Sequence, residues 1–121
     1  MIQDALNEFA KEVYQNAVEH GFHGDDANRS AVANYAIWCS NLHGEVSELW
    51  EATRKGNLEI LCDKAFPDDA LPLTCEEEEL ADIIIRALDT ATARGINIGR
   101  AVQLKHEFNK TRPFKHGGKL A

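Results

Sequence analysis

The stretch LHGEVSELWEA, residues 42–52, combines apolar and acidic side chains in one helical pattern. Leu42, Val46 and Leu49 recur at intervals of three and four residues, which predicts a single apolar stripe along an α-helix. Glu45 and Glu48 are three residues apart and therefore point to the same side of that helix. Carboxylates beside an apolar stripe form either an ordinary solvated edge of the helix or a site that binds a positively charged group.

Four helices are predicted around this stretch, at about residues 2–19, 30–55, 74–94 and 98–110. Glycine and Asx residues interrupt the pattern at 20–30, and prolines make 57–73 a connector. Thr74 and Glu77 have the spacing of a capping box, and Asn97 is placed to cap the last helix. Strand-like alternation never exceeds a few residues. The prediction is an all-α fold, a four-to-five-helix bundle in one domain spanning residues 1–121.

The composition excludes several classes of protein. A net charge of −7 argues against a nucleic-acid binder, although the acidic run 75–82 contrasts with a basic tail at 104–119. Three cysteines without a CxxC pair predict neither a disulfide framework nor a zinc knuckle. No apolar run has the length of a membrane span, and the N-terminus does not resemble a signal peptide. A cytoplasmic protein without membrane contact is expected.

A second pair of carboxylates, Glu79 and Asp82, has the same three-residue spacing on the third predicted helix. If the two helices pack antiparallel, Glu45, Glu48, Glu79 and Asp82 converge. Four like charges would repel one another, and a divalent cation would reverse that cost. Oxygen ligands favour Mg²⁺ or Mn²⁺ over zinc.

The spacing alone does not establish a metal site. Twenty acidic residues in this chain should produce about three acid-x-x-acid pairs by chance, and four are present. A solvated acidic face is therefore the competing interpretation. A di-iron carboxylate bundle is disfavoured, because it requires Glu-x-x-His pairs and the sequence has none.

Two further residues share the predicted metal face. Trp38 lies seven residues before Glu45, close to two full turns, so its ring is a candidate to stack on a nucleobase or to fill the core. Arg86, four residues after Asp82, is a candidate phosphate ligand or an ordinary ion-pair partner. His20, Phe22 and His23 are also possible lining for a base pocket.

The segments EVSELWEATRKG (45–56), EEELADIIIRALDTATARGINI (77–98) and KHEFNKTRPFKHGGK (105–119) together resemble the MazG-like nucleotide pyrophosphohydrolases, of the all-α NTP pyrophosphatase superfamily. The similarity is to the small, stand-alone and phage-type members. It covers roughly residues 9–119. The shared pattern is ExxE on one helix and ExxD on the next. The stretch between Glu48 and Glu79 is longer here than in compact members.

The resemblance implies Mg²⁺-dependent hydrolysis of nucleoside triphosphates to the monophosphate and pyrophosphate, for dNTPs or non-standard nucleotides in a house-cleaning role. It also implies a homodimer or homotetramer with sites near the subunit interface. Metal binding falls to Glu45, Glu48, Glu79 and Asp82, with Glu48 and Glu45 as catalytic candidates and Trp38 for the base. The candidates for phosphate binding are Arg86, Lys105, Asn109, Arg112 and Lys115.

Two alternatives remain open at this point. One is a helical oligomerisation or interaction module, in which the acidic residues form only a solvated surface. The other is a pyrophosphohydrolase that acts on another substrate, such as phosphoribosyl-ATP. The preferred base, the number of metal ions and the identity of the general base do not follow from the residues.

Overall fold

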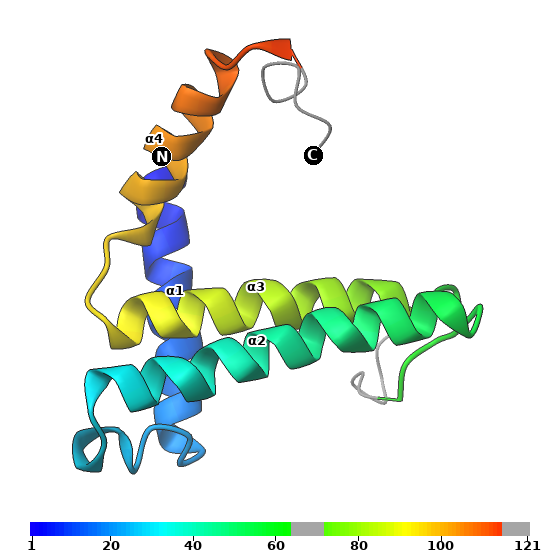
Figure 1. The fold of residues 1–121 in the computed structure, drawn as a ribbon, viewed down its shortest axis with the longest axis horizontal. Coiled ribbons are helices and arrows are strands. Elements are labelled where there is room, and N and C mark those ends of the chain that lie inside the picture. The colour runs from blue at the N-terminus through cyan, green and yellow to red at the C-terminus, as the bar shows by residue number, and fades with distance from the viewer. Residues whose placement is uncertain (64–71, 115–121) are drawn as a thin grey trace.

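The structure is a computed structural model that describes residues 1–63 and 72–114. Its α-helices are α1 (Ile2–Glu19), α2 (Ala31–Arg54), α3 (Cys75–Ala93) and α4 (Ile98–Lys110), with a short 3₁₀ helix η1 (Asp26–Asn28). In Figure 1, α2 and α3 run side by side in opposite directions, α1 crosses them, and α4 projects away from them. The predicted all-α class is confirmed for these residues. None of the described helices is long and apolar enough to cross a lipid bilayer.

Side-chain caps determine where α2, α3 and α4 begin. The Ser30 side chain accepts a hydrogen bond from the Ala33 N–H at the start of α2. Thr74 and Glu77 form the predicted capping box at the start of α3. Asn97 caps α4. Each cap satisfies N–H groups that have no partner within the helix, so these helices begin where predicted.

A close crossing joins α1 to α4. Gly99 packs directly against the backbone of Gln3, and a Cβ atom at that position would overlap the Gln3 carbonyl group. Asn7 bridges the same junction, because its Nδ2 donates to Asn97 Oδ1 over 2.8 Å and its Oδ1 accepts from the Gly99 N–H over 2.7 Å. The contact therefore fixes how α4 leaves the body of the chain.

The two ends of the connector between α2 and α3 are tied together. Leu61 and Thr74 form an isolated antiparallel bridge. The Cys62 N–H donates to the Leu73 carbonyl and the Cys75 N–H donates to the Ile60 carbonyl, each over 2.8 Å. The start of α3 is thereby held against the chain that leaves α2.

The described residues bury fewer apolar side chains than a conventional hydrophobic core does. Among the described residues the buried apolar side chains are Ala10, Leu88 and Ala91, and no large side chain is fully buried. The apolar stripe predicted for residues 42–49 is not fully buried, because Val46 is 48% exposed, and Ile84 on the facing helix is 56% exposed.

Candidate metal centre and adjoining cavity

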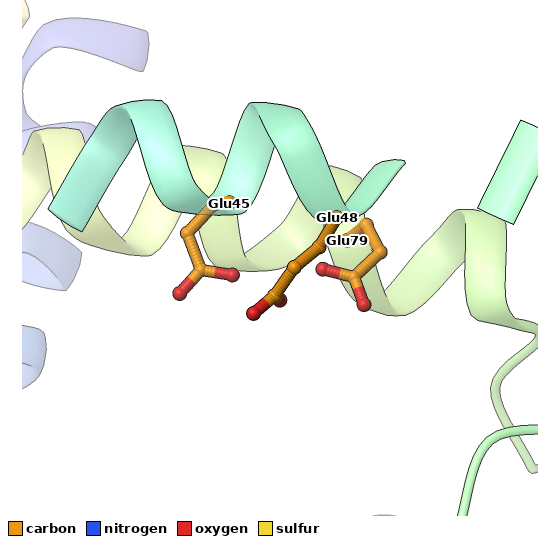
Figure 2. A group of neighbouring side chains, drawn as sticks. All are labelled: Glu45, Glu48 and Glu79. Carbon is orange, nitrogen blue, oxygen red and sulfur yellow. The ribbon is translucent and has the colours of Figure 1, made fainter. Parts of the chain in front are cut away.

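Three of the four predicted carboxylates come together between α2 and α3. Glu45 and Glu48 extend from α2, Glu79 extends from α3, and Figure 2 shows all three carboxylates on the same side of the helix pair. One oxygen from each residue lies within 4.8 Å of the others. Antiparallel packing produces this convergence, since it brings the middle of α2 against the first half of α3.

Two oxygens of this cluster are buried without a hydrogen-bond partner, Glu45 Oε2 and Glu79 Oε2. Glu45 is only 8% exposed, although it is one residue away from the half-exposed Val46. A buried carboxylate oxygen without a donor costs free energy in the folded state. The cluster therefore has a capacity for cations or donors that the described protein groups do not fill.

The cluster also shifts the protonation of its own members. Burial first, and then a hydrogen bond with Glu48 and the charges of Glu48 and Glu45, raise the pKa of Glu79 to about 7. Burial also raises the pKa of Glu45, against the effect of Arg86 and with help from the charges of Glu48 and Asp82. Both shifts have the direction expected when carboxylates share a site away from bulk water.

Arg86 provides one positive charge to the cluster. Its Nε donates to Glu45 Oε1 over 3.0 Å, which is the ion-pair role that the sequence left open beside phosphate binding. The bond occupies one oxygen of Glu45 and leaves Oε2 orphaned. The Arg86 side chain is 42% exposed, so its remaining nitrogens stay accessible to a ligand.

The donor set suits a hard divalent cation. The described members are all carboxylates, the ligand type that Mg²⁺ and Mn²⁺ prefer. Burial and the neighbouring carboxylates disfavour the charged forms of Glu79 and Glu45, and a divalent cation would favour those forms and contact the two unpaired oxygens. Asp82, the fourth predicted ligand, lies beside Glu45 in the wall of the neighbouring cavity.

A cavity of about 630 Å³ adjoins the cluster between α1, the 20–30 loop, α2 and α3. Its volume falls in the range of small-molecule sites. Glu45, Asp82 and Arg86 line it at the side of the acidic cluster, and Trp38 lines it from α2. The candidate base-binding ring of Trp38 and two of the four candidate metal ligands, Glu45 and Asp82, thus line one cavity, whereas Glu48 and Glu79 are not among its lining residues.

A buried histidine anchors the loop to this cavity. The side chain of His23 is 6% exposed, and its Nδ1 and Nε2 lie 2.5 Å from Asp26 Oδ2 and 2.7 Å from Asp89 Oδ1. Burial lowers the pKa of His23, but the hydrogen bonds to Asp26 and Asp89 outweigh it and the pKa is raised above 6.5. The sequence offered His23 as a pocket candidate but gave no sign of Asp89, since the contact joins residues 66 positions apart.

The described part of the basic tail, residues 104–114, does not line this cavity within one chain. Lys105 and Asn109 lie on α4, which points away from the α2–α3 pair (Figure 1). Arg112 follows the end of α4, and the Lys105 ammonium lies 4.8 Å from the ring centre of Phe108. Lys115 lies outside the described residues. Their predicted role at phosphate stays a prediction.

Comparisons of the chain with protein-family models, with curated proteins and with solved structures found no match. The function is therefore inferred from the geometry above and from the motifs of the sequence.

Proposed function

We propose that the chain is a Mg²⁺-dependent nucleoside triphosphate pyrophosphohydrolase of the all-α NTP pyrophosphatase type. The observation that supports it is the convergence of Glu45, Glu48 and Glu79, with two orphaned oxygens, at the edge of a cavity lined by Trp38. An acidic cluster beside an aromatic cavity suits a ligand that is both polyanionic and flat. A nucleoside triphosphate with its divalent cation has these properties.

Each residue of the proposed site has a separate role. Glu45, Glu48, Glu79 and Asp82 would hold the cation, with Mn²⁺ as an alternative to Mg²⁺. A cation held there would supply positive charge against the phosphate oxygens and the negative charge that develops on them during hydrolysis. Glu48 is the exposed member of the cluster and is the candidate that orients the attacking water toward the α-phosphorus. Arg86 is the described cation positioned to hold Glu45 and to contact a phosphate oxygen.

The proposal includes assembly into a homodimer or homotetramer. Large apolar side chains remain exposed on the two helices that carry the acids, among them Trp50 at 62% and Ile84 at 56%. A chain of 121 residues is long enough to bury a substantial core, so their exposure favours coverage by a second copy. In such an assembly, Lys105, Asn109 and Arg112 would reach phosphate from a neighbouring subunit.

The same exposed side chains favour one rival, a helical oligomerisation module without catalysis. Such a module needs the apolar surface but has no use for carboxylate oxygens buried without partners. A second rival retains the chemistry and changes the substrate to another pyrophosphate-linked compound, such as phosphoribosyl-ATP.

The test is pyrophosphate release from a panel of NTPs, dNTPs and phosphoribosyl-ATP in the presence of Mg²⁺. We expect release with the monophosphate as co-product, and a loss of at least about a hundredfold in Glu48→Gln. Glu51→Gln is the matched control, because Glu51 is on the same helix but pairs with Arg54 and Lys55 at the surface. The control should retain activity.

Metal binding is measured separately by thermal unfolding. Millimolar Mg²⁺ or Mn²⁺ should raise the melting temperature of the wild type, and Glu79→Gln should abolish that gain. No hydrolysis of any substrate together with a metal-independent melting curve would reject the enzyme in favour of the interaction module.

A further inference from the structure

The far end of the cavity has its own polar wall, two helical turns from the acidic cluster. On α2, Trp38 precedes Glu45 by seven residues, and on α3, Asp89 follows Asp82 by seven residues. Because the helices are antiparallel, both steps lead in the same direction, about 10 Å along the axes. Trp38 and Asp89 line the same cavity. This separation matches the span of a nucleotide from its α-phosphorus to the outer edge of its base.

His23 has no hydrogen-bonding capacity left for a ligand. Both of its ring nitrogens face carboxylates, and a neutral imidazole has only one N–H to donate. The geometry is satisfied by an imidazolium that donates to Asp26 and Asp89 together. Arg29 adds a second cation against Asp26, at 3.4 Å. The group formed by His23, Arg29, Asp26 and Asp89 is therefore close to charge balance, and His23 acts by holding Asp89 in place.

Asp89 is thus a fixed hydrogen-bond acceptor in a cavity with an aromatic wall. Its Oδ1 accepts from His23, and Asp89 is one of the residues that line the cavity. The His23 and Trp38 ring centres are 6.2 Å apart, so the acceptor lies next to the ring on which a base would stack. Together they present a flat face and an acceptor edge.

We infer that Asp89 is a specificity-determining residue, held by His23 as a positioning residue, that selects nucleobases carrying an exocyclic amino group. The inference rests on the proposed function only in taking the ligand to be a nucleotide. Cytosine, adenine and guanine offer an amino group to the carboxylate. Uracil and thymine have one N–H between two carbonyl oxygens, which a carboxylate repels.

The experiment measures binding of metal-free deoxynucleosides to the full chain by calorimetry or NMR titration. Deoxycytidine, deoxyadenosine and deoxyguanosine are compared with deoxyuridine and thymidine. We expect the amino-bearing bases to bind at least about tenfold more tightly, as for a hydrogen bond to a charged group. Asp89→Asn should reduce the preference to about threefold or less, because an amide offers both a donor and an acceptor.

Two further variants separate specificity from folding. Asp25→Asn is the matched control, since Asp25 is on the same loop, is largely exposed and contacts Arg29 at 3.7 Å. It should retain the full preference. His23→Gln should weaken binding of the amino-bearing bases while leaving deoxyuridine affinity unchanged, a selective loss that general disruption of the loop would not produce.

Equal affinities for the five nucleosides, no binding of any, or an unchanged preference in Asp89→Asn would each overturn the inference. If Asp89→Asn does not fold, the wild-type ratio together with the selective loss in His23→Gln decides. The outcome is independent of the proposed reaction. Base preference without pyrophosphate release would reject the reaction and keep the inference, while release without base preference would do the opposite.

Discussion

The two helix pairs of this chain are joined in different ways. The α1–α4 pair is joined by close fit, with Gly99 against the Gln3 backbone and Asn7 bonded to both Asn97 and Gly99. The α2–α3 pair buries carboxylates without partners and leaves large apolar side chains at the surface. At the α1–α4 junction, the Asn7 side chain is hydrogen-bonded to Asn97 and Gly99. At the α2–α3 junction, two carboxylate oxygens have no described hydrogen-bond partner and large apolar side chains are exposed.

This difference indicates where the molecule has capacity to interact. Polar atoms buried without partners and apolar side chains in water both raise the free energy of the isolated chain. On α2 and α3 the two features lie close together, with Glu45 buried and Val46 exposed in adjacent positions. A cation would relieve the first and a second copy would relieve the second.

The largest expected effect comes from charging the apolar surface. In Ile84→Lys, a cation replaces a half-exposed apolar side chain on α3, and the dissociation constant of the assembly should rise about a hundredfold. Analytical ultracentrifugation across a concentration series measures it. Val32→Lys, at the first turn of α2 and 80% exposed, is the control. A wild type that is monomeric at all concentrations would remove the comparison.

A smaller effect is expected at the other junction. Gly99→Ala places a Cβ atom against backbone, which cannot move aside as a flexible side chain would. We expect a loss of about 1–3 kcal/mol in the free energy of unfolding, measured by urea denaturation. Gly44→Ala is the control, because an added Cβ meets no atom there. An unchanged midpoint in Gly99→Ala would mean that α4 is not held by this crossing.

The smallest expected effect is a pH dependence of stability. The pKa of Glu79 is raised from 4.5 to about 7 in the folded chain, so the folded state binds more protons than the unfolded state between these values. Its contribution is present below 4.5 and is lost as the pH rises to about 7. The pKa of His23 is also raised, so its contribution is lost as the pH rises above 6.5.

Melting temperature in a chelating buffer should therefore fall by a few degrees as the pH rises through these ranges. Mg²⁺ should restore part of the loss at the alkaline end, because it replaces the protons of the cluster. Glu79→Gln should show a shallower fall below neutral pH and no restoration by Mg²⁺, while His23 still titrates. A melting temperature that increases with pH in the wild type would contradict the assigned shifts.

The fold was predictable because its determinants are local. Ser30, Thr74 and Asn97 bond to N–H groups within three residues, and such caps can be read directly from the sequence. Periodicity was less informative about burial. It placed Val46 on an apolar stripe but did not show which stripes other elements cover, since that depends on contacts between distant segments.

The convergence of the acidic side chains was predictable from local spacing and helix packing, whereas contacts between distant residues were not. Three-residue spacing placed Glu45 beside Glu48, and antiparallel packing added Glu79. The contact of Asp89 with His23 had no signal in the sequence, because neither residue belongs to a local pattern. The tail residues Lys105 and Asn109 illustrate the opposite limit, since a motif can identify a basic segment without placing it in space.

Because the two ends of the connector between α2 and α3 are hydrogen-bonded to each other, the length of the connector does not affect the rotation of α3 about its own axis. The bridge between Leu61 and Thr74 and the capping box set the residue at which α3 begins, and this fixes the side of the helix on which Glu79 lies. Because loop-closure entropy grows slowly with length, extra residues between the ties cost little. The chain can therefore carry a long connector between Leu61 and Thr74 while the rotation of its acidic residues about the α3 axis stays the same.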